Sequence, residues 1–191
     1  MKRLTTIAVL ITAVTLSAGC SANGVPESPE QIQRIDPVTA PHNDTDVMFL
    51  QMMVSQYGPA AEILTLAQER AVDPQVKTLA AAVAVTQADE AKTMLNWLTA
   101  WSLPTAAAAE PSLHAGHGGL PTSGKSEVEA LRKAADFDKT FLNLLIGRQH
   151  QAVEYARMEL TSGAHPGSLD LATRIDQSRT AQIEMMLKLV A

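Results

Sequence analysis

The chain has 191 residues and a formal net charge of −5; 46% of its residues are hydrophobic and only 4% are aromatic. An acidic chain of this kind argues against nucleic acid as a partner and against attraction to anionic lipid head groups. Abundant alanine, leucine and methionine with few aromatic residues favour an all-α fold over a β-sandwich.

The first 19 residues have the layout of a secretory signal peptide. Lys2 and Arg3 precede an uncharged segment, residues 4–19, which ends in small residues directly before Cys20. This segment is shorter than the roughly 20 apolar residues that span a bilayer. Cys20 is the only cysteine, and its position resembles the lipidation site of a bacterial lipoprotein. That resemblance implies a diacylglyceryl group on the Cys20 thiol; the alternative is a signal anchor that stays uncut.

Cleavage before Cys20 would remove two basic residues and move the formal charge from −5 to −7. Because the single thiol would be acylated, the mature chain would form no disulfide and would offer no thiolate to a metal or to catalysis. Two acyl chains anchor a protein stably. We therefore expect an exported protein, lipid-anchored at the outer face of the cell membrane or in the cell envelope, with the membrane as a partner.

Residues 20–41 follow as a flexible tether. They contain four prolines and two serines but no apolar periodicity, a composition typical of linkers. The remaining residues, 42–191, are enough for one domain with its own core.

An internal repeat dominates this domain. Residues 46–98 align with residues 138–190 at a constant offset of 92, without a gap. Prolines that coincide at one register argue for a duplicated helical hairpin over chance periodicity. Among the identical pairs are Asp46 and Asp138, Phe49 and Phe141, Glu62 and Glu154, Pro74 and Pro166, and Met94 and Met186.

Hairpin one is expected over residues 43–101. A polar residue among 43–45 can cap its first helix, and Asp73–Pro74 is a strong signal for the start of its second helix. Gly58–Pro59 interrupts the first helix, because an interior proline removes a backbone hydrogen bond. We expect a kink near Ser55; a complete break into two helices is the alternative.

Hairpin two is expected over residues 126–191, with Gly163 ending its first helix and Pro166 opening its second. Residues 102–125 between the hairpins are rich in alanine and glycine and predict a long crossover loop. Four amphipathic helices with short turns inside each hairpin fold most simply as an antiparallel four-helix bundle.

Residues 42–190 resemble the bacterial domain-of-unknown-function 305 family. The opening motif His42-Asn43-Asp44-Thr45-Asp46 is followed by Phe49 and Met52-Met53, and residues 137–142 repeat it in part. The resemblance implies a small exported protein with a ferritin-like bundle, and some members of the family are associated with copper.

The same resemblance implies a histidine pair in the first helix of each hairpin. The matching positions hold Gln56-Tyr57 in hairpin one and Arg148-Gln149 in hairpin two, and His150 stands one place beyond. The metal ligands of the family are therefore largely missing from this chain.

Other thioether and imidazole groups suit copper. A rearranged site would use His114 and His117 of the crossover loop together with other candidates. The alternative places the methionines in the core and the two loop histidines in solvent. The complete candidate set is His42, Met52, Met53, His114, His117 and His150.

The carboxylates give no sign of catalysis. The chain contains no Glu-x-x-His element of the kind that ferritin-like di-iron sites require, and no phosphate-binding, lipase or metalloprotease motif. We expect Glu62, Glu90 and Glu154 to form a buried polar core, paired with Arg148 or Arg179.

Two functions follow from the sequence. The first is a non-catalytic, envelope-anchored helical binding module without a cofactor, whose partner is another envelope protein or a small apolar ligand. The second is a copper-binding or copper-tolerance lipoprotein that uses the rearranged histidine and methionine set.

Overall fold

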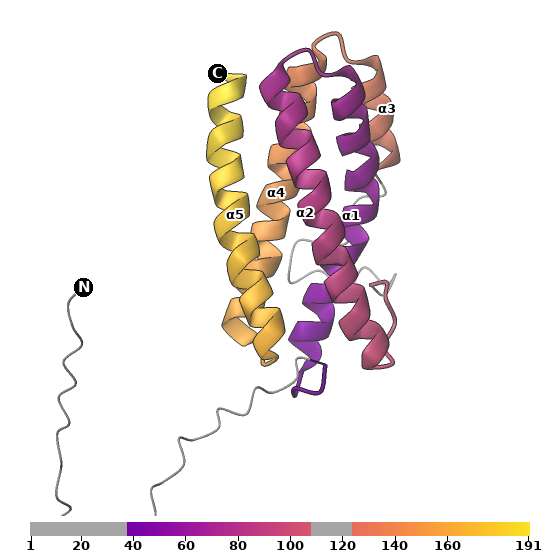
Figure 1. Cartoon of the computed structure of the whole chain (residues 1–191), viewed down its shortest axis with the longest axis vertical. Coiled ribbons are helices and arrows are strands. Elements are labelled where there is room, and N and C mark those ends of the chain that lie inside the picture. The colour runs from indigo at the N-terminus through magenta and orange to yellow at the C-terminus, as the bar shows by residue number, and fades with distance from the viewer. Residues whose placement is uncertain (1–37, 108–123) are drawn as a thin grey trace, which may run out of the picture. The chain divides into compact units, whose positions relative to one another are not determined.

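The structure, a computed structural model, describes residues 38–107 and 124–191. Over these ranges it contains helices and no strands: α1 Asp44–Arg70, α2 Pro74–Ala100, α3 Lys125–Lys133, α4 Phe137–Ser162 and α5 Pro166–Val190. Figure 1 shows the four long helices side by side, with the short α3 at one end. The expected all-α bundle is thereby confirmed. The predicted signal peptide, Cys20 and most of the tether and crossover loop lie outside the described residues.

None of the helices in residues 38–107 and 124–191 combines the length and the apolar character that a membrane crossing requires.

The helix ends follow from the local sequence. Asn43 caps α1 through its side chain, and Asp46 accepts the Asn43 N–H in return, which completes a capping box. Asp73 caps α2 with Pro74 at the first helical position, as predicted. Gly163 ends α4 and Pro166 opens α5, also as predicted. These caps satisfy backbone groups that would otherwise lack partners at each helix end.

Helix α1 continues through Pro59 without interruption. The alternative of a complete break is therefore wrong. Pro59 has no N–H to offer the Ser55 carbonyl four residues earlier, while the Ser55 hydroxyl donates to the Gln51 carbonyl at 2.7 Å. The kink near Ser55 remains a prediction.

Helix α3 is an addition to the predicted four helices. Val128 and Leu131 of α3 are buried, and the helix packs against α1 and α4. Gly124 precedes it with φ 73°, and a Cβ at this position would lie 2.5 Å from the Cβ of Pro59. Both the positive φ and this close approach require glycine.

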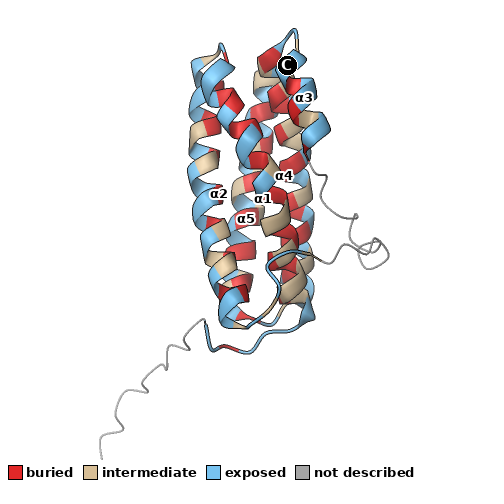
Figure 2. Cartoon of the chain, turned by 90° about the vertical axis from the view of Figure 1, so that its right-hand side faces the viewer, coloured by how far each residue is buried: buried red, intermediate tan, exposed pale blue. Residues whose placement is uncertain are grey.

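The core has an internal two-fold relation. Two apolar clusters divide the bundle, one containing Phe141 and Met186 and the other Phe49 and Met94. Phe49 and Phe141 are repeat mates and lie in opposite clusters, as do Met94 and Met186. The offset of 92 residues therefore relates one cluster to the other. Figure 2 shows buried residues facing inward along the whole bundle. The structure thus confirms two tandem hairpins with equivalent environments.

Two aspartates connect the hairpins reciprocally. Asp46, at the start of α1, accepts backbone N–H groups from the turn between α4 and α5, and its repeat mate Asp138 does the same for the turn between α1 and α2. The donors are Ala164 (3.1 Å) and His165 (2.9 Å) for Asp46, and Val72 (3.0 Å) and Asp73 (2.7 Å) for Asp138. The first turn of each hairpin's opening helix therefore lies beside the turn of the other hairpin, and α1 and α4 are antiparallel neighbours.

Candidate functional site

A buried ionic cluster lies in the middle of the bundle. The Tyr57 hydroxyl of α1 donates a hydrogen bond to Oε2 of Glu90 on α2, and Nη2 of Arg179 on α5 donates to the same oxygen. Arg179 Nη2 also lies 3.2 Å from the Tyr57 hydroxyl. Arg179 has no exposed surface, and Glu90 is 7% exposed. The guanidinium neutralises the carboxylate, so the cluster carries no net charge into the core.

Burial raises the pKa of Tyr57 far above its usual value, with the neighbouring Glu90 acting in the same direction and Arg179 opposing it. The phenol therefore stays protonated and continues to donate its hydrogen bond to Glu90.

The positions related to this cluster by the repeat form a second polar layer, and all of them carry side-chain amides. The repeat mates of Tyr57, Glu90 and Arg179 are Gln149, Gln182 and Gln87. Gln149 Nε2 donates to Gln182 Oε1, in the place where Tyr57 meets Glu90. One half of the interior thus carries an ion pair, while the other half carries neutral groups of similar reach.

Gln56 of α1 and Arg148 of α4 are repeat mates, and they contact each other where the two hairpins meet. Gln56 Nε2 donates to the Arg148 carbonyl at 2.8 Å, and Arg148 Nη1 donates back to the Gln56 carbonyl at 3.4 Å. The Arg148 guanidinium also forms an ion pair with Glu127 of α3. This pair explains why α3 lies against α4 at this point.

The residues at the positions where the resemblance implies histidine pairs do not fit a copper ion. The four positions hold Gln56, Tyr57, Arg148 and Gln149. A guanidinium is only a hydrogen-bond donor, and an amide oxygen is a hard ligand that suits copper poorly. Among the described residues, no group of three His, Cys, Asp or Glu side chains could hold a metal ion.

The other predicted metal ligands do not converge. The exposed His42 ring stacks on Trp101 at 3.9 Å between centroids, whereas Met52 and Met53 have no exposed surface and belong to the core. His150 is exposed on α4, roughly 20 Å along the bundle from the end where His42 lies, given 1.5 Å per helical residue. The remaining two candidates, His114 and His117, lie outside the described residues.

The predicted polar core is correct in part. Glu90 and Arg148 are buried, but Glu62 and Glu154 are exposed, so their assignment to the core is wrong. Their place in each helix turns them outward, and Glu62 pairs with Arg132 at 3.0 Å on the surface. The acid that pairs with Arg148 is Glu127 instead.

A buried carboxyl pair, Asp46 and Glu159, escaped the sequence analysis. Neither side chain has exposed surface. Burial raises the pKa of Glu159 to about 8, and the neighbouring Asp46 adds to this effect, while the Ser168 hydroxyl opposes it. Apart from the nearby Ser168 hydroxyl, no group among the described residues offers the Glu159 oxygens a hydrogen bond; a proton on Glu159 supplies a hydrogen bond to Asp46.

Asp46 takes the opposite charge state. Burial alone would raise its pKa, but hydrogen bonds from Glu159 and from the N–H groups of Asn43, His165 and Ala164 outweigh burial and lower the pKa. The pair therefore holds one proton near neutral pH. The sequence signal was the departure from the repeat, because the mate of Glu159 is Ala67.

Two tandem hairpins, reciprocal aspartate caps and polar layers at repeat-related positions define a class of duplicated all-α bundles. The sequence profile of the family "Domain of unknown function (DUF305)" matches residues 46–190. The chain belongs to this family.

Solved structures agree with this assignment. A DUF305 fragment from Deinococcus radiodurans is 23% identical with a TM-score of 0.67, covering 78% of this chain and 97% of that one. A "putative secreted protein DUF305" from Streptomyces coelicolor is 24% identical with a TM-score of 0.68, covering 76% and 91%. CopM in its Cu(I)-bound form is 26% identical with a TM-score of 0.63, covering 75% and 94%. A comparison with curated proteins gives no match.

Proposed function

We propose that this chain is a non-catalytic helical binding protein, exported and held at the cell envelope by a lipid on Cys20. The observation that carries the proposal is the buried Tyr57–Glu90–Arg179 cluster. It includes Tyr57, which occupies one of the positions where the family resemblance implies a histidine. Breaking such a buried pair is strongly unfavourable, so the interior has little freedom to rearrange around a metal ion.

The signal-like residues 1–19 and the single cysteine that follows them support the location. The description of the Streptomyces coelicolor relative as a "putative secreted protein" agrees with export. The sequence contains no Glu-x-x-His element and no phosphate-binding, lipase or metalloprotease motif, which supports a non-catalytic role.

Metal titration tests this proposal. The full-length protein is titrated with Cu(I), Cu(II) and Zn(II) and followed by isothermal titration calorimetry. We expect no stoichiometric binding below micromolar concentrations, because the four positions where the resemblance implies histidines hold two amides, a phenol and a guanidinium group. Submicromolar binding of one ion per chain would contradict the proposal.

Copper handling is the second candidate function. The specific observation in its favour is the similarity to CopM, whose structures include Cu(I)-, Cu(II)- and Ag-bound forms. Because Met52 and Met53 are enclosed in the core and His42 and His150 lie far apart, this candidate depends chiefly on His114 and His117.

Replacing His114 and His117 together with alanine tests the second candidate. If copper handling is the function, the double variant should lose most of its Cu affinity in the same titration and the cells should lose copper tolerance. Thr173→Ala serves as a control, because this exposed residue of α5 is outside the candidate set. Unchanged affinity and tolerance in the double variant would exclude the copper function.

A further inference from the structure

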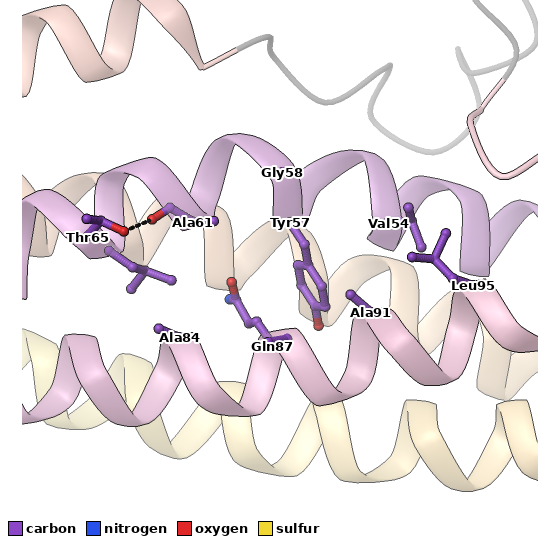
Figure 3. A pocket seen from close by; sticks show the side chains of 11 residues that line it. Val54, Tyr57, Gly58, Ala61, Thr65, Ala84, Gln87, Ala91 and Leu95 are labelled. Atoms are coloured by element: carbon purple, nitrogen blue, oxygen red, sulfur yellow. Dashed lines mark hydrogen bonds between the residues drawn. The ribbon is translucent and has the colours of Figure 1, made fainter.

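We propose that an apolar groove between α1 and α2 binds a small neutral amphiphile, a molecule with an apolar body and one hydroxyl group. This inference rests on the proposed binding function and assigns its site and ligand class. The groove has a volume of about 380 Å³, which lies within the usual range for small-molecule pockets. Figure 3 shows its side chains between the two helices, with Tyr57 and Gln87 extending across the space.

Small residues create the groove. Gly58 and Ala61 line it from α1, and Ala84, Ala88 and Ala91 line it from α2. A Cβ at Gly58 would meet nothing within 4 Å, so this side is open. The Thr65 hydroxyl donates to the Ala61 carbonyl of its own helix at 2.9 Å, which leaves the Thr65 methyl group to face the groove.

Hairpin two provides an internal comparison, because the same surface there carries larger side chains. In place of Thr65 and Ala84 it has Arg157 and Asp176, which form an ion pair at 3.0 Å between α4 and α5. The other replacements are Gly58 by His150, Ala61 by Val153, Ala88 by Thr180 and Ala91 by Ile183. The two hairpins have thus diverged at this surface: hairpin two has an ion pair between its helices, and hairpin one has an apolar groove.

Gln87 indicates what the groove would bind. Its side chain is 6% exposed, and its Oε1 atom has no hydrogen-bond partner. The Nε2 atom of the same amide also makes no hydrogen bond to a described residue and, unlike Oε1, keeps accessible surface. The other polar side chains of the groove are already engaged, because the Tyr57 hydroxyl donates to Glu90 and the Thr65 hydroxyl donates to the Ala61 carbonyl. A ligand hydroxyl in the groove would accept a hydrogen bond from Nε2, or donate one to Oε1 after a half-turn of the amide, while the apolar body of the ligand covers the alanines.

The groove also argues against a charged ligand. Its lining contains no ionisable side chain other than the Tyr57 phenol, whose pKa is raised far above its usual value, mainly by burial. A carboxylate or an ammonium group would lose its hydration in this groove without gaining a counter-charge. A neutral donor, such as an alcohol or a phenol, avoids that cost.

Binding of 4-hexylphenol, compared with its methyl ether 4-hexylanisole, tests the proposal. The full-length protein is titrated with each compound by isothermal titration calorimetry, and shifts of ¹H–¹⁵N amide signals locate the contact. We expect the phenol to bind about three- to tenfold more tightly, the usual net value of one hydrogen bond. The largest shifts should fall on α1 and α2 around Gly58 and Ala88.

Two variants make the test specific. T65R/A84D transfers the ion pair of hairpin two onto the groove and should abolish phenol binding, whereas T173R/A181D places the same changes on exposed positions of α5 and should leave binding intact. Q87L should keep the groove but remove the preference for phenol over anisole. Circular dichroism verifies that each variant is folded.

Equal phenol affinity in T65R/A84D and in wild type would overturn the proposal, as would a preference that survives Q87L. A concentration-dependent dimer that T65R/A84D dissociates would show that a second copy covers the groove, and would also overturn it. The metal titrations do not involve these positions. The phenol experiments therefore test the groove proposal, and the metal titrations test the proposed binding function, independently of each other.

Discussion

Glu159 holds a proton inside the protein that it would release in the unfolded chain. The ordinary pKa of a glutamate side chain is 4.5, whereas the pKa of Glu159 in the folded protein is about 8, chiefly because of burial and secondarily because of Asp46. Between these values the folded state binds more protons than the unfolded state. By linkage, the free energy of unfolding therefore falls as pH rises from about 4.5 to about 8.

Glu159→Gln tests this at the residue scale. The neutral amide replaces the protonated carboxyl and can still donate a hydrogen bond to Asp46. The stability of the variant should therefore lack the Glu159 contribution, which reaches at most about 1.4 kcal/mol per pH unit. Urea unfolding from pH 5 to pH 9 measures both proteins.

The two stability curves should separate as pH rises, with the variant the more stable protein above pH 8. Asp46 does not affect the comparison between pH 5 and pH 9. Its pKa is lowered, so its contribution to the free energy of unfolding disappears only in more acidic solution. Parallel curves throughout would show that Glu159 is ionised in the folded protein.

At the scale of elements, the ends of α1 and α4 reveal how the repeats diverged. Ala67 and Ala71 end α1, while their mates Glu159 and Gly163 end α4. A Cβ added to Gly163 would lie 2.5 Å from the Glu159 Oε1 atom. The glycine therefore provides the space that the buried carboxyl occupies.

Gly163→Ala should destabilise the protein by about 1–3 kcal/mol, the typical cost of overpacking. In the Glu159→Ala background the same change should cost less, because the contact with the carboxyl is removed and the pair then reproduces Ala67 and Ala71 of hairpin one; the contact of the new Cβ with the carbonyl oxygen of residue 159, at 2.7 Å, remains. Thermal unfolding of the two single variants and the double variant measures the coupling. Additive losses would contradict the dependence of one residue on the other.

Sequence reasoning worked where a local signal occurs twice. Asp73–Pro74 and Pro166 start their helices by capping chemistry that needs no tertiary information, and the offset of 92 predicted the pairing of the two cores. It failed for Glu62, because helical periodicity alone does not decide on which side of an apolar stripe a neighbouring residue falls.

The missed features all involve side chains that meet across elements. The Glu127 partner of Arg148 lies on α3, a separate helix at the start of the range that was predicted for hairpin two. Glu159 meets Asp46 only because the turn of hairpin two lies beside the start of α1. Such contacts depend on the docking of the hairpins, which sequence spacing does not specify.

At the scale of the whole molecule, Arg179 and Glu90 join the two hairpins through the core. Arg179→Met should destabilise the protein by about 3–5 kcal/mol, because it leaves the Glu90 carboxylate buried without its counter-charge. R179Q/E90Q introduces the amides of the opposite layer and should recover part of that loss. Urea unfolding with a comparison of slopes measures both variants.

A double variant that is no more stable than R179M would show that the charges matter less than the packing of the arginine side chain. Recovery in the double variant would show that the two layers are interchangeable in shape, and that only one of them acquired charge.

The crossed aspartates also say something about ancestry. Asp46 and Asp138 each accept backbone N–H groups from the interhelical turn of the other hairpin. A hairpin on its own would therefore have an aspartate without these donors and a turn without this acceptor. Two identical halves would resolve both deficits at once by facing each other around a dyad, as isologous partners do. The present chain is therefore most simply understood as an ancient homodimer whose subunits were fused end to end, after which each half was free to specialise.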